Sequence, residues 1–138
     1  MKKRLIFIYI FFFIVEYSLR TFVKSYKYHE VGFFLEFLPL VITSLLVSVF
    51  YKNEILKANI GLTYFQLTAT SIGGLLTAKT VLYFQWYYWL IAPEYRNVPG
   101  DMNEGLVWDL LFLIIGSLVI GVSYLILIRT IKLQYKSI

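Results

Sequence analysis

Residues 106–128 read LVWDLLFLIIGSLVIGVSYLILI, an apolar run in which Asp109 is the only charged residue. At a rise of about 1.5 Å per residue, this run forms a helix of about 35 Å, which matches the hydrocarbon core of a bilayer. The apolar residues are continuous and do not alternate with a period of two, so the run is typical of a helix and not of a barrel strand. It therefore predicts a transmembrane span.

Three more apolar runs of similar length precede this one, at residues 5–23, 31–51 and 60–81. The composition agrees with four spans, because 59% of the 138 residues are hydrophobic and only 15% are charged, against roughly 25% charged in soluble domains. The segments between the runs are short, and no domain boundary interrupts them. We therefore predict one domain over residues 1–138, an all-α integral membrane protein folded as an antiparallel, up-down-up-down bundle of four transmembrane helices.

The segment between the third and fourth spans, residues 82–105, begins with a cluster of aromatic residues. Four of them are closely spaced: Trp86, Tyr87, Tyr88 and Trp89. If the third span continued through them, its helix would be about 50 Å long, which exceeds the bilayer core. Trp and Tyr favour the level of the lipid headgroups. We expect an aromatic interfacial extension of the helix that ends at Pro93 and anchors the chain or binds a partner.

Lys and Arg are distributed unevenly between the two sides of the predicted membrane. The outer loops hold three positive residues, Lys24, Lys27 and Arg96. The other side holds eight: Lys2, Lys3, Arg4, Lys52, Lys57, Arg129, Lys132 and Lys136. Because positive residues are retained in the cytoplasm, this bias predicts that the N- and C-termini face the cytoplasm of a bacterial-type inner membrane.

Four charged residues within the spans fall near the outer surface of the predicted membrane. They come from three separate spans and are Glu16, Arg20, Glu36 and Asp109. Glu16 and Arg20 are four residues apart and share one helix face. Charged groups in a membrane are costly and usually face a bundle interior. We expect these four to meet in a pocket that is open to the outside and binds a ligand or forms ion pairs.

Small and polar residues mark the helix faces that we expect to point inward. Glu36 shares a face with Pro39 and Thr43, and Asp109 shares a face with Gly116 and Ser123. The third span carries a stripe of six such residues: Thr63, Gln66, Thr70, Gly73, Gly74 and Thr77. Small residues at this spacing let helices approach closely. We therefore interpret the glycine pair in that stripe, together with Gly116, as packing positions.

Lys79 has two possible placements. If the third span ends near residue 81, Lys79 lies at the interface and its amine reaches water. If the span covers residues 72–92 instead, Lys79 lies near the middle of the membrane and needs an acidic partner. We favour the first placement, because Lys79 also lies about 160° around the helix from Thr63. In the second, Lys79 is an additional partner of the charged pocket.

The chain lacks the residues needed for most metal sites and for a catalytic triad. The chain has no cysteine and one histidine, His29, so we predict no metal site, no cofactor and no Ser/His/Asp catalytic set. The net charge is +5, but the positive residues lie at the ends of the apolar spans. This placement is typical of residues that orient a membrane protein and not of a nucleic-acid-binding face. We expect a protein that is not an enzyme, although an enzyme that acts on lipid headgroups through paired carboxylates remains an alternative.

Two functions fit these observations. The first is an accessory or binding protein that recognises a membrane-protein partner, a lipid or a peptide through the outer charged pocket and the aromatic segment. The alternative is a proton- or ion-coupled transporter that works as a homo-oligomer, with Glu16 and Glu36 as the titrating groups. The first is favoured because the chain is short and a four-helix monomer leaves little room for a translocation path.

Overall fold

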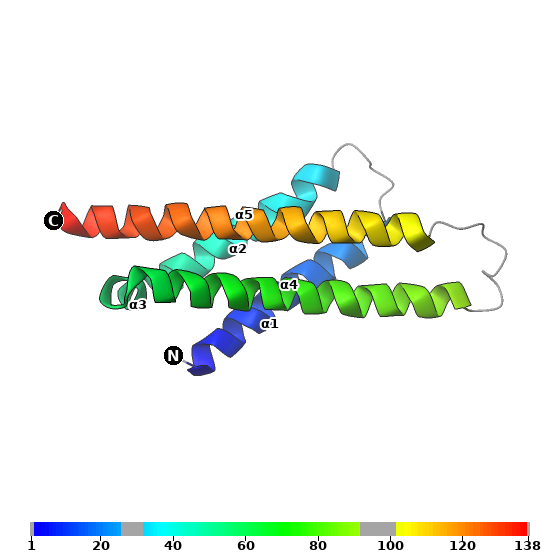
Figure 1. Cartoon of the computed structure of the whole chain (residues 1–138), viewed down its shortest axis with the longest axis horizontal. Helices are drawn as coiled ribbons and strands as arrows, with labels where there is room; N and C mark the ends of the chain where they lie inside the picture. Colours follow the sequence, from blue (N-terminus) through cyan, green and yellow to red (C-terminus); the bar gives the residue numbers. More distant parts are fainter. Residues whose placement is uncertain (1, 26–31, 92–101, 138) are drawn as a thin grey trace.

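The chain was described with a computed structural model, which defines the backbone of residues 2–25, 32–91 and 102–137 and the side chains of residues 4–19, 37–84 and 110–137. This part of the chain contains helices and no strands (Figure 1). The helices are α1 (Lys2–Ser25), α2 (Gly32–Phe50), α3 (Lys52–Lys57), α4 (Ile60–Ile91) and α5 (Met102–Lys136). The all-α prediction is therefore confirmed for the described residues.

Each apolar run of the sequence lies wholly or almost wholly on one long helix, and α1, α4 and α5 are longer than their runs. The helix α4 continues through the aromatic segment to Ile91, and α5 continues past Ile128 to Lys136. By length and hydropathy, one helix in the described part of the chain can cross a membrane, over Leu110–Lys136, with a mean hydropathy of 2.7. A second apolar stretch, Phe37–Phe50, is shorter.

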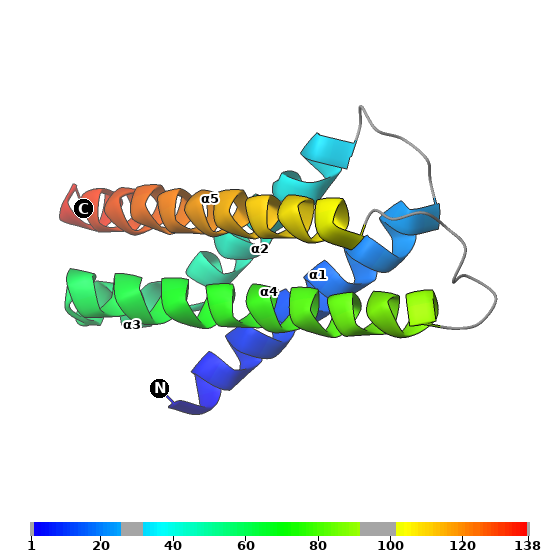
Figure 2. The same cartoon turned by 45° about the vertical axis from the view of Figure 1, so that its right-hand side comes forward.

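The four long helices form two layers. In the first layer α4 and α5 lie side by side, and α1 and α2 cross behind them (Figures 1 and 2). Successive long helices run in opposite directions, so both ends of the chain lie at one end of the molecule. The helix α1 crosses behind α4, from one side of α4 at its N-terminus to the other side at its C-terminus (Figures 1 and 2). Both the up-down-up-down order and this crossing decide which side chains meet.

The short helix α3, which was not predicted, forms the connection between α2 and α4. It ends at Lys57, and its C-cap residue Ala58 has an extended backbone, with φ −91° and ψ 164°. The next helix begins after Asn59, and the Asn59 side-chain oxygen accepts a hydrogen bond from the Gly61 N–H at 3.1 Å. This arrangement is an N-cap, which satisfies one of the free N–H groups at the start of α4. Lys132 of α5 donates to the Ala58 carbonyl oxygen at 3.1 Å and fixes this turn against the bundle.

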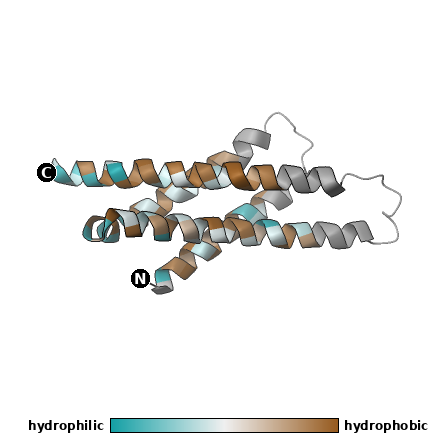
Figure 3. Cartoon of the chain, viewed as in Figure 1, coloured by the Kyte–Doolittle hydropathy of each residue, from teal (hydrophilic) through white to brown (hydrophobic). Residues whose placement is uncertain are grey.

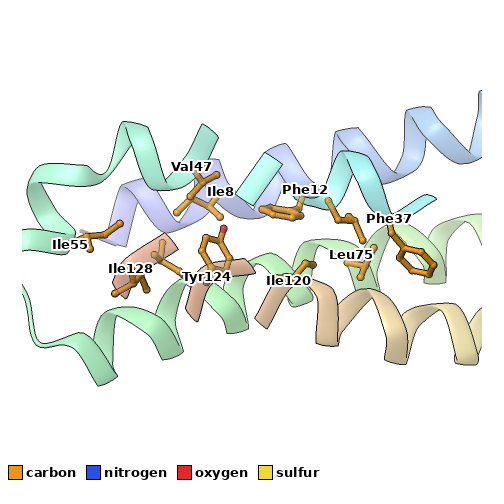
Figure 4. Packing of buried hydrophobic residues seen from close by; sticks show 11 residues of the cluster. Ile8, Phe12, Phe37, Val47, Ile55, Leu75, Ile120, Tyr124 and Ile128 are labelled. Atoms are coloured by element: carbon orange, nitrogen blue, oxygen red, sulfur yellow. The ribbon is translucent and has the colours of Figure 1, made fainter. Parts of the chain in front are cut away.

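The interior contains side chains from all five helices. Buried apolar residues of α1 and α2 face those of α5, with Ile8, Phe12 and Val47 on one side and Ile120, Tyr124 and Ile128 on the other (Figure 4). The side chain of Ile55 from α3 is also fully buried. These contacts hold the two layers together.

The surface of the described part of the molecule is unusually apolar for a soluble protein. Large apolar side chains are exposed on all four long helices, for example Phe7, Val49, Phe65 and Leu118, each more than 60% exposed. Several polar side chains are buried instead: Glu16, Thr43, Ser44, Ser48, Thr63, Ser71 and Lys79. Hydrophobic residues run along the helices, and hydrophilic residues gather mostly toward the end that holds the termini (Figure 3). Exposed apolar surface of this extent marks contact with lipid or with another protein.

Candidate functional site: a buried ion pair between α1 and α4

The helices α1 and α4 form the most extensive helix contact in the described structure. A Cβ atom at Gly74 would collide with the backbone carbonyl oxygen of Tyr9 and lie 3.1 Å from the Cβ of Phe12. At Gly73 a Cβ would lie 3.4 Å from the ring of Tyr9, an ordinary contact. Gly74 is therefore the position that allows the two backbones to approach closely, as small residues do between membrane helices.

This close contact brings together two oppositely charged side chains. The Nζ atom of Lys79 lies 3.1 Å from the Oε1 atom of Glu16. The Lys79 side chain is 7% exposed and the Glu16 side chain is 1% exposed, so both are withdrawn from the surroundings. Two buried charges attract each other strongly at this distance, because little water screens them. The structure thus places a contact between oppositely charged side chains in the interior.

The position of Lys79 corrects the placement that we favoured from the sequence. We expected its amine to reach water at the end of the third span, but Lys79 is buried. The reason is that α1 crosses α4 at an angle (Figures 1 and 2). Near the start of α1, Leu5 and Ile8 line a small pocket together with Thr63 of α4, and further along α1 Glu16 meets Lys79. A residue about 160° around α4 from Thr63 therefore still faces α1, at a later point along the helix. The long apolar stem of Lys79 suits a buried position of this kind.

Polar contacts flank the ion pair along α4. The hydroxyl groups of Tyr9 and Thr77 form a hydrogen bond between α1 and α4. Thr77 also donates its own hydroxyl hydrogen to the Gly73 carbonyl oxygen, at 2.8 Å. Because Thr77 has one hydrogen to give, Tyr9 is the donor of the bond between the helices. The α1–α4 contact thus combines close backbone packing, a hydroxyl bond and an ion pair.

A second buried polar cluster joins α4 to α5 and was missed from the sequence. The hydroxyl groups of Ser71 and Tyr124 are 2.8 Å apart, and both residues are fully buried. Ser44 of α2, which is also fully buried, donates to the carbonyl oxygen of Leu40 at 2.8 Å. A tyrosine in the middle of an otherwise aliphatic run was the available signal, because a buried Tyr hydroxyl usually needs a partner.

The other charged residues of the predicted pocket are placed by backbone only. Arg20 lies in the last turns of α1, Glu36 in the first turns of α2 and Asp109 in the first turns of α5. Because successive long helices alternate in direction, these positions lie at the end of the bundle opposite the termini. Their side chains lie outside the described residues, so their convergence with Glu16 stays a prediction.

The aromatic residues are also placed by backbone only, whereas the surroundings of the third packing glycine are defined. Trp86, Tyr87, Tyr88 and Trp89 lie on the last part of α4, and their side chains are outside the described residues. At Gly116 of α5, a Cβ would lie 3.3 Å from side-chain methyl groups of both Leu40 and Leu75. Gly116 therefore lies where α2, α4 and α5 meet.

The site holds the components of an ion pair and not those of a metal centre. Across the residues whose side chains are defined, no group of three or more His, Cys, Asp or Glu side chains is close enough to hold a metal ion. Comparison of the chain with known protein families, curated protein sequences and solved structures finds no match. The interpretation of the site therefore rests on its geometry and polarity.

Proposed function

We propose that the chain is a multi-pass protein of an inner or plasma membrane, with four spans on α1, α2, α4 and α5 and both termini in the cytoplasm. The observation that carries this proposal is the apolar surface, with large apolar side chains exposed on all four helices while several hydroxyl and charged groups are buried between them. Contact of such a surface with water is unfavourable because of the hydrophobic effect, whereas contact with lipid chains avoids this cost. The eight positive residues at the end that holds the termini support the orientation.

A labelling experiment distinguishes four spans from one. The natural chain has no cysteine, so single cysteines can be introduced at Asn53, Asn97 and Ser137 and labelled in intact cells with a membrane-impermeant reagent. Four spans predict that Asn53→Cys and Ser137→Cys are both protected and that Asn97→Cys is labelled. If only α5 spans the membrane, Asn53→Cys and Asn97→Cys behave alike and Ser137→Cys behaves oppositely, which would contradict the proposal.

Within that membrane, we infer that the protein is a non-enzymatic accessory protein that binds a membrane partner. Glu16 and Lys79 neutralise each other inside the bundle and hold α1 on α4. Three more charged residues, Arg20, Glu36 and Asp109, then lie on helix ends opposite the termini, beside the aromatic end of α4. Charged and aromatic side chains at one end of a rigid bundle suit recognition of a protein or peptide.

Purification in mild detergent tests this function. We expect the wild-type protein to recover one partner at a fixed stoichiometry, and the triple variant Arg20→Gln, Glu36→Gln, Asp109→Asn to lose it. The matched control is Lys52→Gln with Lys57→Gln, which removes charge from exposed positions at the opposite end. Recovery of homo-oligomers alone, or equal loss of the partner in the control, would contradict the proposal.

A second function, ion-coupled transport by a homo-oligomer, is favoured by one observation: Glu16 is a carboxylic acid buried between helices that we place in the membrane. Such groups serve as proton relays in transporters. Flux into proteoliposomes that depends on a proton gradient and is lost in Glu16→Gln with Glu36→Gln would support this function. Flux that survives both changes would exclude those residues as coupling groups.

A further inference from the structure

An open groove separates α1 from α2 near the end that holds the termini. Its volume is about 470 Å³. It exists because α1 packs mainly on α4 and α2 packs mainly on α5, so the two helices of the rear layer touch each other little. The groove is lined by Arg4, Phe7, Ile8, Phe11, Val47, Phe50 and Tyr51.

The lining is apolar along the walls and charged at one end. Phe7 and Phe50 are 68% and 83% exposed, and they form an aromatic rim. The Tyr51 hydroxyl is occupied, because it donates to the backbone oxygen of Arg4 at 3.2 Å. The Arg4 side chain forms an ion pair with Glu54 and is still 59% exposed, so part of its guanidinium group can bind a further acceptor. An apolar channel with a guanidinium group at its mouth fits a molecule with one hydrocarbon chain beside one anionic head.

The charge around the groove favours an anionic ligand. Eight Lys and Arg residues lie in the chain segments at this end, and Glu54 is the one acidic residue among them. A guanidinium group binds phosphate through two parallel hydrogen bonds. Clusters of Lys and Arg beside a transmembrane helix attract anionic lipids on the cytoplasmic side.

The size of the groove favours a lipid chain over a helix of another protein. Its volume lies within the range of about 300–1,000 Å³ that is typical of small-molecule clefts. A partner helix is about 10–12 Å wide with its side chains and needs a broader surface. The groove is therefore matched to one acyl chain.

We propose that this groove binds an anionic phospholipid of the cytoplasmic leaflet, with an acyl chain on Phe7, Phe11 and Phe50 and the phosphate on Arg4. This inference rests on the proposed multi-pass placement, in which the same end of the bundle faces the cytoplasm. In this arrangement Glu54 competes with the lipid phosphate for Arg4, so the two partners of one ion pair have opposite effects on lipid binding.

Native mass spectrometry of protein released from mixed phosphatidylglycerol and phosphatidylcholine nanodiscs measures this binding. We expect wild-type protein to retain phosphatidylglycerol preferentially, one molecule per chain. Arg4→Gln lowers its retention by about fivefold, because one basic group near an anionic lipid contributes about 1 kcal/mol. Glu54→Gln raises retention, because it frees the guanidinium group. Lys57→Gln, at an exposed position on α3 outside the groove, is the charge control and changes retention less than twofold.

A second pair of variants tests the hydrocarbon part without disturbing the fold. Phe7 and Phe65 are both 68% exposed, but only Phe7 lines the groove. Phe7→Ala is expected to lower retention about twofold, by the loss of dispersion contacts with the acyl chain, and Phe65→Ala to leave it unchanged. Monodisperse elution of each variant shows that it is folded.

The lipid site would be refuted by equal retention of the two lipids, or by a dimer that carries no lipid. It would also be refuted if Glu54→Gln left retention unchanged or lowered it. Equal losses in Arg4→Gln and Lys57→Gln, or in the two Phe variants, would refute it as well. Cysteine labelling tests the membrane topology independently of lipid retention. Correct labelling without lipid retention refutes the lipid site alone, whereas incorrect labelling refutes the multi-pass proposal.

Discussion

The molecule contains two ion pairs that both begin on α1 and differ in their surroundings. Glu16 near the middle of α1 pairs with Lys79 of α4, and the two side chains are 1% and 7% exposed. Arg4 near the start of α1 pairs with Glu54 of α3, and these side chains are 59% and 30% exposed. The same helix thus carries one pair that is sealed from the surroundings and one that is open to them.

The difference in exposure predicts different roles. An exposed ion pair contributes little to stability, because water and salt screen it, and its members are free to exchange partners. A buried pair has a desolvation cost that its own attraction offsets, so removal of one member leaves an uncompensated charge. We conclude that Glu16–Lys79 fixes the packing of α1 on α4, whereas Arg4–Glu54 leaves a charged group available for binding.

The largest expected effect comes from a single neutral substitution in the buried pair. Glu16→Gln or Lys79→Met should lower the free energy of unfolding by about 3–5 kcal/mol, because each removes the opposite charge that lies 3.1 Å from the buried charge that remains. Unfolding by SDS in mixed micelles, followed by circular dichroism, measures the loss. A loss below about 1 kcal/mol for both variants would mean that the buried pair contributes no more to stability than an exposed pair does.

The next largest effect tests the packing that brings the buried pair together. Gly74→Ala places a methyl group against the Tyr9 carbonyl oxygen, so α1 must move away from α4. The expected loss of unfolding free energy is about 1–3 kcal/mol, the usual range for overpacking. Gly73→Ala is the matched control and should cost less, because its Cβ meets only the edge of the Tyr9 ring. Equal losses from the two neighbouring glycines would show that the backbones are not in close contact at Gly74.

A neutral buried contact gives a smaller effect. Tyr124→Phe removes the hydroxyl that lies 2.8 Å from the Ser71 hydroxyl, and should cost about 1 kcal/mol in unfolding free energy. Tyr135→Phe, at a residue that is 66% exposed, should change stability by less than about 0.5 kcal/mol. Chemical denaturation of the purified variants compares them. If Tyr135→Phe costs as much as Tyr124→Phe, the interior position of the hydroxyl has no energetic consequence.

The smallest effect belongs to the exposed pair. Glu54→Gln should change the free energy of unfolding by about 0–1 kcal/mol, and the change should shrink further as salt is raised, since the pair is open to screening. The same denaturation assay at low and high ionic strength measures it. A salt-independent loss above about 2 kcal/mol would mean that Arg4–Glu54 is a structural contact and not an available binding group.

The sequence predicted the helical fold well because four apolar runs, each about as long as a bilayer is thick, allow little else. It did not predict α3, because the segment Lys52–Lys57 is a single polar turn that folds against the bundle through Ile55. It also underestimated the length of α5, whose helix continues past Ile128 to Lys136. The predicted helical extension after the third span is present, because α4 continues through the aromatic segment to Ile91. How many helices cross a membrane remains a prediction.

The candidate site was predicted less well, because helical faces were assigned as if neighbouring helices ran straight alongside each other. On α4 the stripe through Gly73, Gly74 and Thr77 does face α1, but Ser71 on another face meets Tyr124 of α5. On α5 the buried positions recur every four residues: Gly116, Ile120, Tyr124 and Ile128. The face predicted from the sequence, through Asp109, Gly116 and Ser123, shares Gly116 with these positions, whereas Ser123 is only half-buried.

For the charged group of Glu16, too, sequence spacing did not suggest the contact that the crossing of the helices creates. Sequence spacing predicts Arg20, four residues away, as a partner, and this pairing stays a prediction because the Arg20 side chain lies outside the described residues. The structure adds a partner that spacing did not suggest, Lys79, 63 positions later in the chain. Only the crossing of α1 over α4 makes that contact possible, and nothing in the local sequence specifies the crossing. The grouping of Arg20, Glu36 and Asp109 at the same depth is still a prediction.

A double-mutant cycle between Glu16 and Lys79 tests the central claim most directly. The free energy of unfolding is measured by SDS titration for the wild-type protein, Glu16→Gln, Lys79→Met and the double variant. We predict that the double variant recovers most of the stability that either single change removes, with a coupling energy above about 2 kcal/mol. Losses that add to within about 0.5 kcal/mol would contradict the claim, because residues that do not touch behave in that way.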